Sequence, residues 1–364
     1  MKCTFFKKWL FLMVGIVFLC LSPFKAYGVE PGFPWSPPYT AEQIAYLCDA
    51  VLWSGGIEKA YRNMDLLALS VEVDARGYIR QKPALRKRKN YFDNYGEILD
   101  YASKKLKVGQ PRNKDVVFIV HPPALRGQTV LDWKYKQSPE KYKAVDYWLY
   151  LPALKNVRRM AMGDRRDGFA GGDLTYDDAI SLEPFDETHT LIGEDILPPG
   201  GVCPSEPREC YVIKYINKNP NYYLSKRLRW IDKQTFIPWR EEQYDRKGSL
   251  KVIFERKMEE IQGYVVSTLW NYWNIQRNYR QPVFIFDYRF DQPMSDAEFT
   301  HDYLRKEFAW RSPSLKEFPL IKRPDELPPR PPVLRGKFKP EIEKERKIKL
   351  PEELERELKE GRLK

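Results

Sequence analysis

The chain has 364 residues, of which 43% are hydrophobic and 31% are charged. This balance excludes a disordered tail and a polytopic membrane protein. The formal charge of +12 is partly local, because the first 28 residues hold four lysines and no acid, leaving 58 basic against 50 acidic side chains beyond them. Five cysteines and three histidines argue against a disulfide-dense or zinc-rich protein.

Residues 1–28 have the three parts of a secretory signal peptide: a lysine-rich start, an apolar run of 13 residues over 9–21, and a small-residue exit at 26–28. The run is shorter than the roughly 20 residues that a spanning helix needs. We therefore predict cleavage after Gly28 and a periplasmic mature protein. A retained anchor and a lipoprotein acylated at Cys20 are the alternatives, and Leu19 is bulky where a lipoprotein signal has a small residue.

The next segment, 29–39, contains four prolines and reads as an extended lead-in. A helix start follows, because Thr40 and Gln43 form a capping box ahead of an apolar stripe that includes Ile44, Leu47 and Cys48. The stripe predicts an amphipathic helix that ends at the serine and glycines of 54–56, with Cys48 on its buried face.

From residue 67 onward, two-residue alternation replaces helical periodicity for some 220 residues. The alternating segments are 67–73, 115–120, 129–135, 145–151, 210–216, 226–231, 238–244, 250–255, 264–272 and 283–290. Turn-type residues join them, as in an antiparallel meander. The sequence thus predicts a mainly β protein, whose large curved antiparallel sheet forms an unclosed half-barrel covered or plugged by N-terminal helices.

Several strands have one aromatic and one charged side, as where Phe284 and Phe286 alternate with Asp287 and Arg289. A sheet this large must curl and cover its apolar face, so we expect either an internal cavity or an interior filled by aromatic side chains. The residues expected to line a cavity are Trp133, Tyr147, Leu149, Trp230, Phe254, Phe284 and Phe286, with Ile44 and Leu47 of the helix closing one end.

Segment 146–182 is the place where chemistry could be expected, because it combines arginines with a glycine-rich loop that holds five aspartates, Asp164, Asp167, Asp173, Asp177 and Asp178. Its glycine cluster lacks the Lys-Ser/Thr ending of a phosphate loop, and its aspartates lack the spacing of a calcium loop. Acids beside so many arginines are more simply ion-paired loop residues than a hydrolase pair. We therefore expect no catalytic residues, no metal and no cofactor.

Two cysteines, Cys203 and Cys210, flank a short loop and can pair in an oxidising compartment. Cys48 then remains as a buried, reduced thiol.

Segment 146–182 also carries a family resemblance. Three runs within it follow a known pattern: Tyr147 to Leu154, Val157 to Met160 and Phe169 to Asp178. Together they resemble the central motif of periplasmic outer-membrane lipoprotein-sorting-like proteins of the LolA/LolB-like superfamily. Flanking segments at 117–129, 228–235 and 244–248 resemble their strand pairs in the same order, so the likeness covers roughly residues 65–310. The motif positions are Tyr150, Pro152, Arg158, Arg159, Gly172 and Asp173.

The resemblance implies an incompletely closed barrel around helices, with an apolar cavity for acyl chains. It implies a carrier of lipid or lipoprotein acyl chains towards the outer membrane, with an inner-membrane transporter or an outer-membrane acceptor as partner. Arg158, Arg159 and Asp173 are expected to be structural, with the arginine pair closing the rim onto loop carboxylates. The alternative is a non-catalytic envelope interaction or assembly protein with a side-chain-filled barrel.

The half-barrel domain is expected to span 40–311, and segment 312–364 departs from its pattern. Eight prolines fall between 313 and 340, and acids alternate with bases beyond them. We expect an extended, mostly solvated arm with a marginal helix, or a segment that docks a partner. Nucleic-acid binding needs a compact basic patch, which the sequence does not show.

Overall fold

The computed structural model describes residues 35–361 except 102, 181, 203 and 307–312. The predicted signal peptide and Cys203 lie outside the described residues. Within the described part of the chain, no helix combines the length and the apolar character that crossing a membrane requires.

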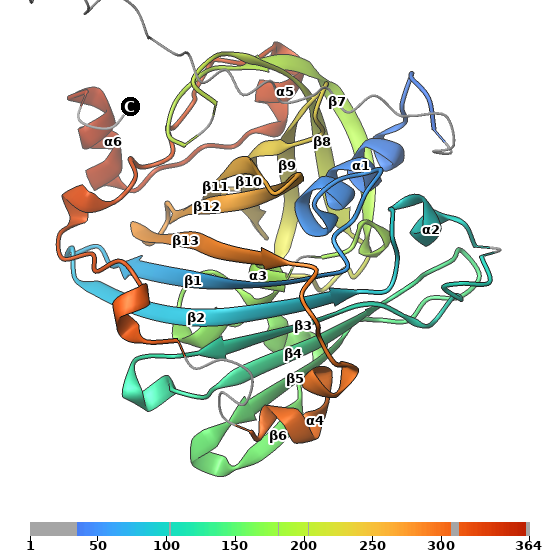
Figure 1. The fold of residues 1–364 in the computed structure, drawn as a ribbon. Coiled ribbons are helices and arrows are strands. Elements are labelled where there is room, and N and C mark those ends of the chain that lie inside the picture. The colour runs from blue at the N-terminus through green and yellow to red at the C-terminus, as the bar shows by residue number, and fades with distance from the viewer. Residues whose placement is uncertain (1–34, 102, 181, 203, 307–312, 362–364) are drawn as a thin grey trace, which may run out of the picture.

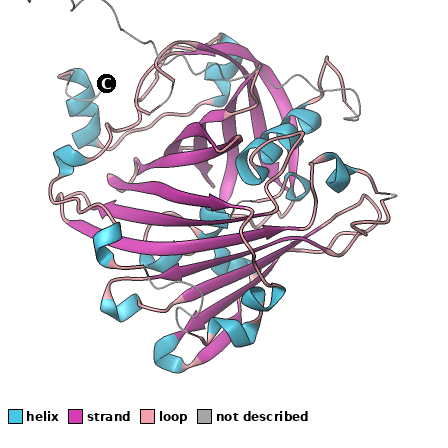
Figure 2. Ribbon diagram, viewed as in Figure 1, coloured by secondary structure: helices cyan, strands magenta, loops and turns pink. Residues whose placement is uncertain are grey.

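A single curved sheet dominates the fold, and short helices lie around it (Figures 1 and 2). The strands are β1 (Asn63–Val73), β2 (Ile79–Asn90), β3 (Pro111–Ile119), β4 (Thr129–Tyr135), β5 (Asp146–Leu151), β6 (Asn156–Arg159), β7 (Glu187–Leu197), β8 (Arg208–Asn217), β9 (Leu224–Asp232), β10 (Pro238–Asp245), β11 (Leu250–Ile261), β12 (Tyr264–Asn274) and β13 (Tyr279–Phe290). The helices are α1 (Ala41–Ser54), α2 (Gly96–Leu99), α3 (Tyr176–Ile180), α4 (His301–Leu304), α5 (Pro340–Glu345) and α6 (Glu352–Lys359).

The strand order, β6-β5-β4-β3-β2-β1-β13-β12-β11-β10-β9-β8-β7, shows that the chain enters the sheet in its middle. It runs outward to β6 through antiparallel neighbours, crosses through 160–186 to the opposite edge at β7, and returns to β13, which pairs with β1. The two edge strands, β6 and β7, do not pair with each other. The prediction of a mainly β, unclosed half-barrel is confirmed.

Local turn chemistry fixes the register of the first hairpin. The Asp74 carboxylate accepts hydrogen bonds from the backbone N–H groups of Arg76 (2.9 Å) and Tyr78 (3.0 Å), and Gly77 adopts a positive φ of 82° that glycine tolerates best. From this turn the two strands pair without a register shift, from Val73 opposite Ile79 to Asn63 opposite Lys89.

Helix α1 begins and ends as its sequence predicts. Thr40 Oγ1 accepts from Gln43 N (3.2 Å), and Gln43 Oε1 accepts from Thr40 N (2.8 Å), which satisfies two free N–H groups of the first turn. The helix stops at Gly55, whose φ is 83°. A Cβ at this position would lie 2.8 Å from the ring of Tyr61. Helix α1 lies on the concave side of the sheet, where it contacts β7 and β12 (Figure 1).

The described residues from 313 to 361, which we call the tail, pack onto the sheet. The Phe318 ring lies 5.8 Å from that of Phe286, and the Phe338 ring lies 4.9 Å from that of Trp230. Ile342 and Leu354 are fully buried. The tail therefore differs from a free arm in that some of its apolar side chains are buried against the sheet, while about half of its described residues are exposed. Prolines keep the tail extended, so it buries isolated apolar side chains without showing a helical or strand periodicity.

Candidate ligand-binding site

An apolar cavity of about 90 Å³ lies on the concave face, above the middle of the sheet. Its floor is made by alternate residues of the central strands, which share one face because side chains alternate along a strand. These floor residues are Met64, Leu66, Ala68 and Ser70 of β1, Lys82, Ala84, Arg86 and Arg88 of β2, and Gln281, Val283, Ile285 and Tyr288 of β13. The floor leaves free space above it because several of its residues have small side chains.

The roof of the cavity comes from two places in the sequence. Leu52 and Trp53 belong to the last turn of α1, and Phe169, Ala170 and Leu174 belong to the glycine-rich loop before α3. Trp53 also meets Trp270 of β12 edge to face, with ring centroids 6.3 Å apart. The cavity is therefore covered by a helix end and a loop, neither of which is a sheet strand.

Two glycines allow the loop to press onto the sheet. A Cβ at Gly168 would lie 1.7 Å from the carbonyl oxygen of Gly172. A Cβ at Gly172 would lie 2.6 Å from Gln281 Nε2 and 2.7 Å from Glu72 Oε1. The contact at Gly168 is to backbone and is sterically forbidden, so this position requires glycine. A side chain at Gly172 would have to displace the ends of the Gln281 and Glu72 side chains. The Gln281 side chain then accepts a hydrogen bond from Asp173 N (2.7 Å), which fixes the loop over β13.

Asp173, the acid of the family motif, has a structural position. Its carboxylate pairs with Arg277 and accepts from Asn274 Nδ2 (2.6 Å). Tyr272 donates its hydroxyl to the Asp173 carbonyl (3.1 Å). These contacts attach the roof loop to β12 and to the turn that follows it.

One wall of the cavity is basic. Arg86 and Arg88 share the Asp115 carboxylate: Arg86 donates from Nε (3.0 Å) and Nη2 (2.8 Å), and Arg88 donates from Nε (2.6 Å). Arg88 Nη1 also donates to the Trp53 carbonyl (2.9 Å). Both guanidinium groups lie over the Trp53 ring, at 5.5 and 5.0 Å from its centroid, within cation–π range.

The acids behind this wall have shifted pKa values. Burial opposes ionisation of Asp115, yet Arg86 and Arg88 hold its pKa below the ordinary value. Asp132 lies directly opposite Asp115 on β4. Burial first, and the Asp115 charge second, raise the pKa of Asp132 to about 8. At neutral pH the two arginines therefore face one ionised carboxylate and one that is largely protonated.

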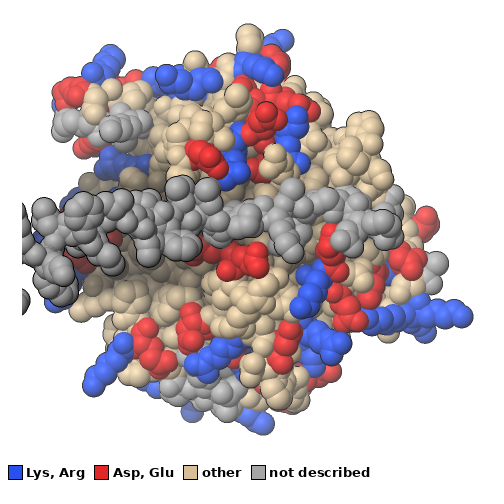
Figure 3. All heavy atoms as spheres, turned by 45° about the horizontal axis from the view of Figure 1, so that its top comes forward, with Lys and Arg blue, Asp and Glu red and all other residues tan. Residues whose placement is uncertain are grey.

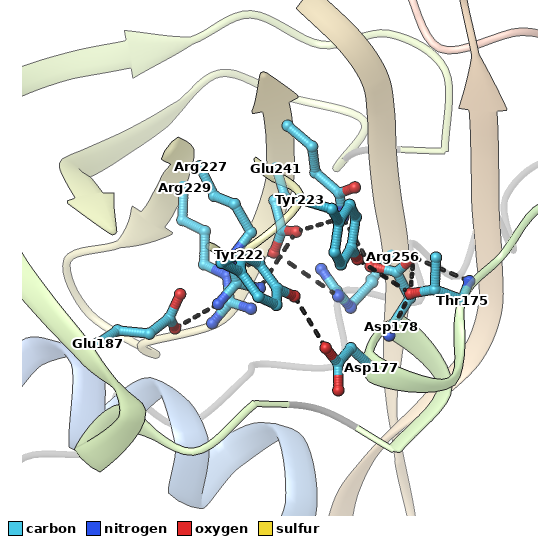
Figure 4. Close-up of polar contacts among 11 residues, drawn as sticks. Thr175, Asp177, Asp178, Glu187, Tyr222, Tyr223, Arg227, Arg229, Glu241 and Arg256 are labelled. Carbon is cyan, nitrogen blue, oxygen red and sulfur yellow. Dashed lines mark hydrogen bonds and ion pairs between the residues drawn. The ribbon is translucent and has the colours of Figure 1, made fainter. Parts of the chain in front are cut away.

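The other half of the concave face, under β7 to β11, is filled by a polar network (Figure 4). Its centre is Glu241, which accepts from Arg229 Nε (2.5 Å) and lies 3.5 Å from Arg227 Nη1 and 3.9 Å from Arg256 Nη2. Arg227 also pairs with Glu187. Although burial alone would raise the pKa of Glu241, the three arginines hold it below its ordinary value.

Helix α3 closes this network from the side of the roof loop (Figure 4). Asp178 accepts from Thr175 Oγ1 (2.8 Å) and from Gln243 Nε2 (2.7 Å). Asp177 accepts from the Tyr222 hydroxyl (3.0 Å), and burial raises its pKa to about 6. These side chains fill the interior around Glu241, while Asp177 and Tyr222 also line a separate pocket of about 330 Å³.

Three of the residues expected to line a cavity lie in the inner core. Tyr147, Leu149 and Phe254 pack with Trp270 and other residues that border the cavity. Ile44 and Leu47 are fully buried beneath α1 in a separate core. The end of the helix at Trp53, rather than these two residues, covers the cavity.

The other four expected lining residues face away from the cavity, which corrects the prediction. Phe284 and Phe286 alternate with the floor residues of β13 and pack beneath the tail. Trp133 donates its indole N–H to the Phe299 carbonyl (3.1 Å), and Trp230 packs on Phe338. The aromatic side of these strands is the outer one, because the tail covers it. The sequence cannot tell which of two buried faces points inward.

The expected closure by the arginine pair is also corrected. Arg159 pairs with Asp146 on the neighbouring strand β5, and the Arg158 side chain is exposed. Tyr150 lies on the outer side of β5 among residues covered by the C-terminal part of the chain. Pro152 begins a short 3-10 helix directly after β5.

The structure describes two of the three cysteines in the disulfide prediction. Cys48 and Cys210 are buried free thiols, and burial raises the pKa of Cys48 to about 11. Because Cys203 lies outside the described residues, its pairing with Cys210 stays a prediction.

Sequence reasoning missed the basic wall on β2. Its signal was present, because Lys82, Arg86 and Arg88 share one side of a strand whose opposite side holds Leu85. A strand in the middle of a large sheet is covered on both faces, so cations on one side must be buried and paired.

On the face seen in Figure 3, basic and acidic side chains intermingle without a compact basic patch. Among the described residues, no three His, Cys, Asp or Glu side chains gather as a metal site would require.

Comparisons with known proteins agree with this geometry. The profile described as "Protein of unknown function (DUF1329)" matches residues 27–183, and a profile described as an uncharacterized protein matches 111–306. No curated protein matches the chain.

Three solved structures share the fold at 16–20% sequence identity. A domain from Vibrio parahaemolyticus, described as outer membrane lipoprotein-sorting, is 20% identical with a TM-score of 0.58 and covers 73% of this chain and 98% of its own. A DUF1329 family protein from Desulfovibrio piger is 20% identical with a TM-score of 0.57, covering 72% and 97%. A LolA superfamily protein from Nitrosomonas europaea is 16% identical with a TM-score of 0.51, covering 73% and 99%.

Proposed function

The chain belongs to the DUF1329 family of proteins of unknown function, and from this premise we propose that it is a periplasmic carrier of lipid or lipoprotein acyl chains. The observation that carries the proposal is the apolar cavity between the central strands and the roof of Trp53 and the glycine-rich loop. Apolar burial would drive binding, at ~25 cal/mol per Å² of surface removed from water. The role is non-catalytic and needs no cofactor.

The fold supports a carrier of this kind. Structures described as lipoprotein-sorting and as LolA superfamily share it. We propose that the cargo moves towards the outer membrane, with an inner-membrane transporter as donor or an outer-membrane protein as acceptor. The signal-like segment at 1–28 supports a periplasmic location.

The size of the cavity sets a condition on uptake. At about 90 Å³ it has room for a few water-sized groups, which is less than a long acyl chain occupies. Uptake therefore requires Trp53 or the roof loop to move. The roof is suited to such movement because a helix end and a loop form it, whereas the floor consists of paired strands.

The test is whether the purified mature protein holds or takes up apolar molecules. Native mass spectrometry and lipid extraction should find a co-purified acyl lipid. The neutral fluorescent probe N-phenylnaphthylamine should gain fluorescence on binding and lose it when an acyl ligand is added. Absence of both lipid and probe binding would overturn the proposal.

The filled half of the concave face favours a second candidate, an envelope assembly protein with a side-chain-filled barrel. There, the network around Glu241 leaves the interior occupied. This candidate predicts no probe uptake and no co-purified lipid, together with a protein partner recovered by crosslinking in cells. The same experiment therefore separates the two candidates.

A further inference from the structure

We propose that the cavity is built for a single-chain amphiphile with an anionic head, of which a fatty-acid carboxylate is the simplest, and that this head binds beside Arg88 and Trp270. The inference rests on the proposed function and names the ligand class of that site. It distinguishes a free acid from an esterified acyl chain, which has no charge at the carbonyl.

The first support is the set of cavity groups that lack a hydrogen-bond partner. Among the described residues of the lining, Trp53 Nε1, Trp270 Nε1 and Arg88 Nη2 are buried without a hydrogen bond. Arg88 Nη2 also lies 2.5 Å from Asp115 Oδ2 in an ion pair, so at most one of its two N–H groups is left for a ligand. The three side chains are 9%, 6% and 1% exposed, so water does not readily satisfy them. All three groups are donors.

A ligand that satisfies donors must accept hydrogen bonds. Ionised carboxylates only accept, and they accept through two oxygens. A buried N–H without a partner costs free energy, so a carboxylate placed here would gain by relieving it. An ammonium head would add donors where acceptors are needed.

The three side chains that carry these donors are neighbours. The Arg88 guanidinium lies 5.0 Å from the Trp53 ring centroid, and the Trp53 and Trp270 ring centroids are 6.3 Å apart. Apolar floor residues such as Leu66, Val283 and Ile285 border the same cavity. Head and chain would therefore lie on adjoining surfaces.

The charges of the wall support the same reading. Arg86 and Arg88 stay protonated in proteins and share the single carboxylate of Asp115. Burial holds Asp132, the next acid on that face, largely protonated at neutral pH. An anionic head would supply the missing negative charge.

Indole N–H groups without a partner also occur elsewhere, which provides a control. Trp230 Nε1 and Trp273 Nε1 are buried without a hydrogen bond, but neither residue lines the cavity. Trp230 packs on Phe338 of the tail, and the Arg330 guanidinium lies 5.6 Å from the Trp273 ring centroid. Of these four indole donors in the described part of the chain, those of Trp53 and Trp270 belong to residues that line the apolar cavity.

The experiment is competition against bound N-phenylnaphthylamine at neutral pH, with four ligands that share a ten-carbon chain: decanoate, decyl phosphate, decanol and decylamine. Decanoate should displace the probe at a concentration at least tenfold lower than decanol, and decylamine should be weakest. Affinity should rise about fourfold for each added methylene. Decyl phosphate as the best ligand would make a phosphate the preferred head and overturn the carboxylate assignment.

Two variants locate the head. Arg88→Met should abolish the preference for decanoate over decanol, while Arg76→Met, on the exposed β1–β2 turn, should leave it unchanged. Because Arg88→Met removes a buried charge and can impair folding, Trp270→Phe is the milder test. It should lower decanoate affinity several-fold with little effect on decanol, and Trp273→Phe is its matched control.

The failures are distinguishable. If the wild-type protein binds no probe, the carrier proposal itself fails. If the probe binds but decanol competes as well as decanoate does, the carrier proposal stands and the anionic-head inference is overturned. An unchanged preference in Trp270→Phe, in a folded protein, overturns the placement of the head.

Discussion

The two halves of the concave face come from one alternating strand pattern, yet one is hollow and the other is filled. Over β1, β2 and β13 the inward positions include small residues such as Ala68, Ser70 and Ala84, which leave the cavity. Over β9 to β11 the inward positions include Arg227, Arg229 and other long side chains that meet at Glu241. Side-chain length on one face, rather than strand arrangement, thus decides where a barrel interior can admit a ligand.

The largest expected effect on the free energy of unfolding comes from a substitution at the centre of the filled half. Glu241→Gln would leave Arg227, Arg229 and Arg256 without their shared carboxylate, so unfolding free energy should fall by ~3–5 kcal/mol. Urea denaturation followed by tryptophan fluorescence measures this. Asp302→Asn removes an exposed ion pair with Arg305 and should change stability by less than ~0.5 kcal/mol. A cost for Glu241→Gln as small as that of the control would mean that the network does not hold this half together.

The next effect tests the covering on the outside of the filled half. Ile342→Ala empties a fully buried position of the tail, and the resulting cavity should cost ~2–4 kcal/mol. Leu320→Ala, at an exposed position of the same tail, is the matched control and should be nearly neutral. Equal midpoints in a thermal or urea melt would show that the tail is not bound to the sheet in solution.

The pH dependence of stability sharpens the picture of the hollow half. The pKa of Asp132 is about 8 in the folded protein and near 3.9 when unfolded. The folded state therefore holds this proton more tightly, and the stability that it contributes is fully present below pH 4 and is lost as the pH rises to 8.

Asp132→Asn should therefore lose less stability than the wild type between pH 5 and pH 8, by ~3–4 kcal/mol. Urea melts at several pH values measure the stability of both proteins. Subtracting one curve from the other cancels the contributions of Glu241 and of other acids with lowered pKa values, because both proteins contain them. Parallel curves for the two proteins would indicate that Asp132 is ionised when folded.

The variant with the smallest expected effect on stability should still lose most of its probe binding. Ala84→Leu places a larger apolar side chain in the cavity floor, so stability should change by less than ~1 kcal/mol while probe uptake falls at least tenfold. Ala75→Leu on the exposed hairpin turn controls for added hydrophobicity. Unchanged uptake in Ala84→Leu would place the bound probe elsewhere.

The sequence predicted the sheet better than it predicted the site. Two-residue alternation and the Thr40 capping box predict local structure, because each depends on neighbours in the chain. The inward orientation of Phe284 was wrong for a different reason. Its side is set by Phe318 and Phe299, which lie elsewhere in the sequence and show no periodicity. A strand buried on both faces does not reveal which face is concave.

The basic wall was hidden by the same limit. Arg88 reads as a surface cation until Asp115 of β3 and Trp53 of α1 are brought against it. Gly168 and Gly172 belong to the glycine cluster of the sequence, but the close approaches that favour glycine involve the loop backbone at Gly168 and the Gln281 and Glu72 side chains at Gly172. Pairings between distant segments carry most of the information that defines this site.

The pairing of β1 with β13 has a consequence for how the protein folds. Arg62 N and Asp291 Oδ1, which meet at 2.8 Å beside this seam, are 229 residues apart in the sequence. Strands β1 to β6 can form their hairpins early, but β1 keeps an unpaired edge until β13 is available. Such non-local pairing slows folding, and an exposed edge invites association with other chains. The newly made chain should therefore depend on chaperones until this central seam closes.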